Sequence, residues 1–190
     1  MDLTPGIGHN NGPALDDGAS WRRFAWARSR EALLPTLPVE VVRLRVARAR
    51  ELGLPYRTYA GLRASTGHDV IALLFSTNAL RLLRATDILS KDRRMRLLAL
   101  TACDRVAMVH APLDPGGVLA SAPLDAAHAA PRLLGTWPTM REQIRAVLQA
   151  RRHPPDRVVL VGEPGPEREW CEAGRLASFV TGDAYFAPLP

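Results

Sequence analysis

The sequence predicts an α/β fold with a small three-layer core, a mostly parallel sheet and an N-terminal helical arm. Two apolar runs in the second half of the chain open on the same tripeptide, Asp-Arg-Val, and end in a proline at the same offset; they span 104–112 and 156–164. A third apolar run covers 70–77. Short runs of this kind are typical of strands covered on both faces, and the helical segments between them favour parallel pairing.

Composition divides the 190 residues into three parts, of which only one is large enough for a core of ordinary size. Residues 1–20 are rich in Gly, Asn and Asp and predict a disordered tail. Residues 21–67 form a basic helical segment, and 68–190 form the α/β core. No apolar stretch reaches the roughly 20 residues of a membrane span, and no signal peptide is evident. With two cysteines in neither disulfide nor metal spacing, we expect a cytoplasmic protein without a membrane partner.

Helix signals recur along the basic segment. Ser20 can cap a short amphipathic helix that begins at Trp21. A second helix is predicted from Pro38 to Leu52 because proline suits the first helical position and a glycine follows the last. A third helix, over 54–67, ends at a glycine that leads into the first strand.

Arginine supplies nearly all of the positive charge, since the formal net charge is +6 and Lys91 is the only lysine. A GC-rich genome would explain arginine in place of lysine, but not the net charge. Arginine forks suit phosphate, so we expect the arm to hold nucleic acid through contacts that ignore base sequence. The alternative is a solvated helix face whose arginine stems cover apolar surface. The six arginines concerned are Arg22, Arg23, Arg43, Arg45, Arg48 and Arg50.

The rest of the core is predicted to alternate helices with the strands, which gives a Rossmann-like topology. Helical periodicity marks 78–85, 91–102, 139–152 and a last helix from 166 or 167 to about 176, and a short edge strand is expected within 179–186. The proline- and alanine-rich connection 112–138 is longer than a plain loop, and such connections often line sites. A protein partner docking through this connection and the helix at Trp21 is a further hypothesis.

Polar residues follow each of the three strands, and the carboxyl ends of parallel strands converge at one edge of a sheet. A histidine beside carboxylates can act as a general base, and two acids four residues apart can share a proton or a metal ion. The bland alternative is local, with 76–78 capping a helix, Asp114 opening a turn and Glu167 offsetting a helix dipole. No complete cofactor motif or metal-ligand spacing occurs, so the cofactor stays open. The candidate catalytic residues are Ser76, His110, Asp114, Glu163 and Glu167.

The segment Gly6-Ile-Gly-His-Asn-Asn-Gly-Pro13 resembles the GIGHNGGP-type N-terminal signature of many small, mostly uncharacterised alphaproteobacterial proteins, some of them linked to phage or mobile elements. The resemblance implies a bacterial lineage. It covers only these eight residues and implies no activity.

The third strand carries a second resemblance. Val158 to Val161, Gly162-Glu163, Glu167 and Ala173-Gly174 together are similar to the last acidic motif of haloacid-dehalogenase-like phosphatases. In that family an acidic pair on this strand and loop holds magnesium, and Ser76 or Thr77 would match its phosphate-binding Ser/Thr. The family's nucleophilic Asp-x-Asp has no counterpart before residue 70. The resemblance implies a phosphate-ester hydrolase or a degenerate relative with the same topology.

Overall fold

A computed structural model describes residues 37–132 and 135–188. The predicted tail, the helix at Trp21, and Arg22 and Arg23 lie outside these residues. The chain separates into two compact units, Met1–Val41 and Val42–Pro190, and the second contains the sheet. Residues 42–67 of the predicted basic segment therefore belong to the same compact unit as the sheet.

Five parallel strands form one sheet in the order β3-β2-β1-β4-β5. The two Asp-Arg-Val runs supply β2 and β4, which pair with opposite edges of β1, so Ala72 is in register with both Asp104 and Val158. The predicted α/β, Rossmann-like fold is confirmed. The strands are β1 (Ala72–Ser76), β2 (Asp104–Val109), β3 (Ala126–Ala129), β4 (Val158–Gly162) and β5 (Ser178–Thr181).

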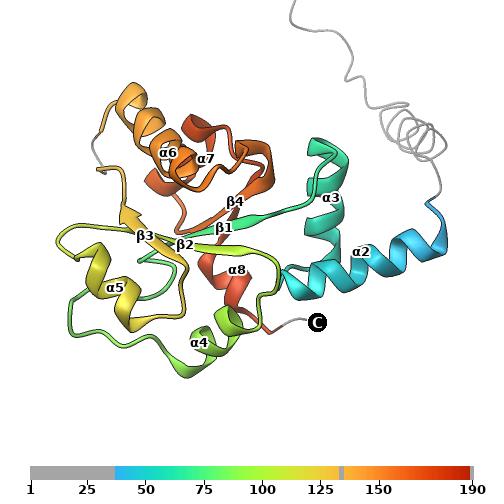
Figure 1. Ribbon diagram of the computed structural model, residues 1–190, viewed down its shortest axis with the longest axis horizontal. Coiled ribbons are helices and arrows are strands. Elements are labelled where there is room, and N and C mark those ends of the chain that lie inside the picture. Colours follow the sequence, from blue (N-terminus) through green and yellow to red (C-terminus); the bar gives the residue numbers. More distant parts are fainter. Residues whose placement is uncertain (1–36, 133–134, 189–190) are drawn as a thin grey trace, which may run out of the picture. The chain divides into compact units, whose positions relative to one another are not determined.

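Helices cover both faces of the sheet and complete three layers. α6 and α7 lie on one face and α4, α5 and α8 on the other (Figure 1). Alternate residues of the central strands face each layer, so Leu73 and Phe75 join the first apolar cluster while Ala72 and Leu74 join the second. The helices are α2 (Val39–Glu51), α3 (Tyr56–Thr66), α4 (Lys91–Leu98), α5 (Pro115–Ser121), α6 (Trp137–Arg151), α7 (Pro166–Gly174) and α8 (Gly182–Phe186), with a 3-10 turn, η1 (Pro155–Arg157), before β4.

The predicted helix over 78–85 is wrong, because the chain turns there. The backbone N–H of Leu82 donates to the carbonyl of Thr77 at 2.8 Å, and Arg81 has a left-handed φ of 59°. A left-handed residue stops a helix, so the apolar periodicity of this segment reflects packing of a turn rather than of a helix. The segment is consequently available to position side chains beyond β1.

The connection 112–138 contains α5 and β3, neither of which was predicted. Asp114 caps α5, whose first turn is Pro-Gly-Gly, and β3 consists of alanine and His128 without any β-branched residue. Neither composition carries a helix or strand signal. The edge strand predicted within 179–186 is confirmed in its first part as β5, whereas the rest forms α8, because the hydroxyl of Thr181 accepts the N–H of Ala184 and starts a helix.

Candidate functional site at the carboxyl edge of the sheet

The strand order places a topological switch point between β1 and β4. From β1 the chain builds outward through β2 and β3 on one side, and β4 and β5 lie on the other. Ligands of open α/β sheets bind in the crevice outside the carboxyl ends of the strands at such a point. The candidate site is therefore formed by the residues that follow β1, β2 and β4.

The hydroxyl groups at the end of β1 serve the local backbone. Ser76 and Thr77 are both fully buried. The Oγ of Ser76 accepts the N–H of Ala79 at 3.0 Å, and the Oγ1 of Thr77 accepts the N–H of His110 at 3.1 Å. These bonds fix the turn after β1 and join it to the end of β2, so neither hydroxyl lies exposed as a nucleophile.

The carboxylate of Glu167 lies at the centre of the site and is only 2% exposed. Its Oε1 accepts hydrogen bonds from Asn78 Nδ2 and from His110 Nε2, each at 2.7 Å. Its Oε2 accepts the backbone N–H of Glu163 at 2.6 Å. The strands β1, β2 and β4 thus each send one donor to a side chain of α7.

This arrangement keeps Glu167 ionised. Burial acts to raise its pKa, but hydrogen bonds from His110, Ser76, the Glu163 backbone and Asn78 outweigh burial, and the pKa lies below its ordinary value. A carboxylate that accepts several hydrogen bonds gains far more as an anion than as an acid. Glu167 is therefore a buried, paired anion rather than a proton donor near neutral pH.

His110 is held on two sides. Its side chain is 14% exposed, and its ring packs on the indole of Trp170 with centroids 5.0 Å apart. Because an ionised carboxylate can only accept, Nε2 carries the proton of this hydrogen bond. Trp170 was not predicted as part of the site, although it lies one helical turn after Glu167 on the same face of α7.

The acidic pair of the predicted site is divided between two partners. The Glu163 side chain turns toward Arg81, with its Oε1 3.6 Å from Nη2, and Arg81 also bonds Asp183 at 2.9 Å. Glu167 instead faces His110 and Asn78. In the described residues, no group of three or more His, Cys, Asp or Glu side chains is placed to hold a metal ion.

Asp114 does not join this cluster. Its Oδ2 accepts the N–H of Gly117 at 2.7 Å and caps α5. Of the five predicted catalytic residues, the structure therefore gathers Ser76, His110, Glu163 and Glu167 at one edge, with Asp114 as a helix cap. Asn78 is the further member, and the strand-end rule that pointed to Ser76 also covers it.

The arginines of α2 differ in their surroundings. The guanidinium of Arg48 bonds the side chains of Asp69 and Glu51 at 2.9 Å each. It also donates to the carbonyls of Val70, Thr101 and Ala102, just before β1 and β2. The donors of Arg48 are therefore used to attach α2 to the segments that precede the sheet strands.

The remaining arginines of this helix are freer. Arg43 and Arg50 are exposed and Arg45 is half-buried. Within the described part of the chain none of these three forms an ion pair. Over the same residues, 37–132 and 135–188, no helix is long and apolar enough to cross a membrane.

Comparison with known proteins adds no relative: no family model, no curated protein and no solved structure matches this chain.

Proposed function

We propose that the protein binds an anionic partner, nucleic acid in the first instance. We also propose that the cluster around Glu167 at the carboxyl edge of the sheet stabilises the fold and does not hydrolyse a substrate. This Glu167 cluster consists of Ser76, Asn78, His110, Glu163 and Glu167. The observation that carries the second proposal is the carboxylate of Glu167, which is buried and already accepts three hydrogen bonds from the chain. The hydroxyl of Ser76 is a fourth donor to this carboxylate, so its lone pairs are already bonded and it has no proton to offer a substrate.

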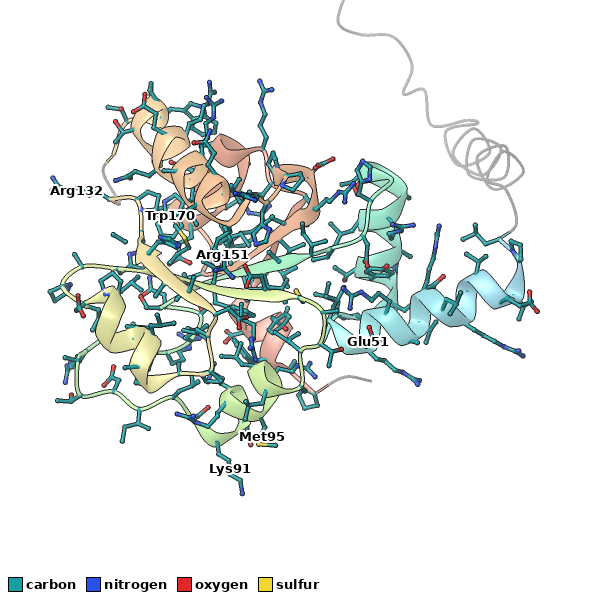
Figure 2. The ribbon with its side chains drawn as sticks, viewed as in Figure 1. Glu51, Lys91, Met95, Arg132, Arg151 and Trp170 are labelled. Carbon is teal, nitrogen blue, oxygen red and sulfur yellow. The ribbon has the colours of Figure 1, made fainter. Side chains whose placement is uncertain are left out.

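The resemblance to haloacid-dehalogenase-like phosphatases supports a degenerate relative. Ser76 and Thr77, which would match that family's phosphate-binding Ser/Thr, already accept the backbone N–H groups of Ala79 and His110, and the Asp-x-Asp nucleophile has no counterpart before residue 70. The residues present do not fit magnesium, because Asn78 donates its amide N–H to Glu167 and the Glu163 side chain turns toward Arg81. The family also uses a basic residue, for which Lys91 is the one lysine of the chain, and Lys91 lies on α4 and points away from the sheet (Figure 2).

An anionic partner is supported by the charge that the fold leaves unpaired. The chain carries a net +6, and Arg43, Arg45 and Arg50 on α2 have no ion pair within the described residues. Exposed arginines bind phosphate through paired donors and release counterions as they do so. Arg22 and Arg23 would extend the same contacts.

Hydrolysis is tested with p-nitrophenyl phosphate and Mg²⁺ on the full chain. We expect the wild type and Glu163→Gln to release nitrophenol at the same background rate. Glu163→Gln is the suitable variant because only the backbone of Glu163 takes part in the Glu167 network. The purely structural role of the Glu167 cluster would be refuted by Mg²⁺-dependent turnover in the wild type that is lost in a folded Glu163→Gln variant.

Nucleic-acid binding is tested by fluorescence anisotropy with duplex DNA, single-stranded DNA and RNA across a salt series. Each lost phosphate contact lowers the slope of log K against log salt by about 1, so Arg43→Gln/Arg50→Gln should lower it by about 2. The matched control, Arg84→Gln/Arg132→Gln, removes two exposed charges elsewhere and should leave the slope unchanged. Equal effects of the two double variants, or no binding at low salt, would rule out α2 as the binding surface.

A further inference from the structure

A second basic region lies apart from both α2 and the Glu167 cluster. A cavity of about 390 Å³ opens between α6 and the end of α7. His153 and Pro155, which lead into β4, and Arg175, which leads into β5, place it beside the amino ends of these strands. Its volume falls within the range of small-molecule sites.

Three arginines line this cavity without a counter-charge. Arg141 and Arg145 are one helical turn apart on α6, and Arg175 follows α7. All three are exposed, and within the described residues none forms an ion pair. No acidic residue lines the cavity. Like charges at this helical spacing repel, so the arrangement costs stability unless an anion joins it.

The neighbouring Arg151, unlike Arg141 and Arg145, has an acidic partner. Arg151 lies on the same helix and bonds both carboxylate oxygens of Asp104, at 2.7 and 2.6 Å. His153 bonds Asp104 as well, at 2.7 Å. The fold therefore provides an acid for the arginine at the end of α6 and none for Arg141 and Arg145.

The walls of the cavity are fixed by packing. Leu148 and Ala173 are buried and form apolar lining. Gly174 allows the end of α7 to approach α6, because a Cβ there would lie 2.5 Å from Cγ2 of Ile144. The positions from which Arg145 and Arg175 extend are thus set by close helix contacts rather than by a loop.

We propose that this cavity binds a small molecule through a diphosphate group. Arginine forks match phosphate oxygens in pairs, and three of them balance the charge of a diphosphate better than that of a single carboxylate. Among the described residues that line the cavity there is no Phe, Tyr or Trp, and the imidazole of His153 is already bonded to Asp104. The site is separate from α2 and goes beyond the nucleic-acid contacts proposed above.

The test is isothermal titration of inorganic pyrophosphate into the full-length protein at low salt. Wild type should bind, and Arg145→Gln should raise Kd by about tenfold or more, since a charge-assisted hydrogen bond is lost. The matched control is Arg152→Gln, which removes the same charge at the end of α6 from a residue that does not line the cavity. It should change Kd by less than about twofold, because only the general charge is reduced.

Three outcomes would overturn the proposal: no binding of pyrophosphate by the wild type, an equal loss of affinity in both variants, or an Arg145→Gln effect on duplex DNA with none on pyrophosphate. The last would make the cavity part of a nucleic-acid surface. Arg43→Gln/Arg50→Gln, measured alongside, should weaken DNA binding and leave pyrophosphate binding unchanged. The α2 proposal and the cavity proposal can therefore fail independently.

Discussion

The carboxyl edge of the sheet and the cavity between α6 and α7 differ in whether their charged side chains have partners within the described chain. At the carboxyl edge a single buried carboxylate, Glu167, receives hydrogen bonds from three different strand ends. In the cavity three exposed arginines have no acidic partner among residues 37–132 and 135–188. A polar group whose partners lie within the chain stabilises the fold, whereas charge left without partners is available to a ligand. We therefore expect substitutions around Glu167 to change stability and substitutions in the cavity to change ligand binding.

The largest effect expected from this comparison is that of Glu167→Ala. Removing the carboxylate leaves Asn78 Nδ2, His110 Nε2 and the N–H of Glu163 without their acceptor in a buried site. We expect the free energy of unfolding to fall by about 3 to 5 kcal/mol, as for other broken buried charge networks. Urea denaturation followed by circular dichroism measures it.

The control for that variant is Glu169→Ala. Glu169 lies on the same helix, two residues later, and is exposed. Its replacement should change the free energy of unfolding by no more than about 0.5 kcal/mol. Similar losses for the two variants would mean that Glu167 acts only through helix propensity or the dipole of α7. The hydrogen bonds to its carboxylate would then not be what stabilises the fold.

Arg48→Ala should have the next largest effect, because Arg48, like Glu167, is a charged residue whose partners lie within the chain. Arg48 makes five hydrogen bonds: one to Glu51 within the helix, and four that connect the helix to Asp69 and to the segments before β1 and β2. We expect a loss of about 2 to 3 kcal/mol in urea denaturation. Arg43→Ala, which removes an exposed arginine of the same helix, should stay within about 0.5 kcal/mol. A loss as large for Arg43→Ala would show that α2 depends on its charge in general.

The pH dependence of stability offers a smaller effect with a defined sign. The pKa of Glu167 in the folded chain lies below its ordinary value, so the ionised side chain stabilises the fold above the unfolded-state pKa of about 4.3. This stabilisation is lost as pH falls through the folded-state pKa. The difference in unfolding free energy between wild type and Glu167→Gln should therefore shrink on acidification from pH 7. A difference that stays constant with pH would mean that Glu167 is not titrating in this range.

Much of the sheet follows from simple sequence patterns. The central strands are apolar runs bounded by turn residues, and their parallel pairing follows from the helices between them. Given that pairing, Ser76, His110 and Glu167 had to come near one edge. The turn after β1 could not be foreseen, because the left-handed backbone of Arg81 is imposed by bonds back to Thr77 and by Asp183.

Other features were hidden for physical reasons. β3 consists of alanines and one histidine, and its strand form comes from pairing with β2 rather than from propensity. The direction of the Glu163 side chain depends on Arg81, which the sequence does not place nearby. The sequence does not predict the cavity, because Arg175 and the arginines of α6 come from separate elements that meet only when α7 packs on α6.

The smallest expected effect is the sharpest test of the comparison. Replacing Arg141, Arg145 and Arg175 together by glutamine removes three charges that hold nothing within the described structure. The free energy of unfolding should change by no more than about 0.5 kcal/mol, with a gain at low salt because repulsion is relieved. Pyrophosphate should raise the Tm of the wild type progressively as its concentration exceeds Kd and leave the Tm of the triple variant unchanged. A loss above about 1 kcal/mol without ligand would show that these arginines support the fold, and the two regions would then differ in degree of exposure rather than in role.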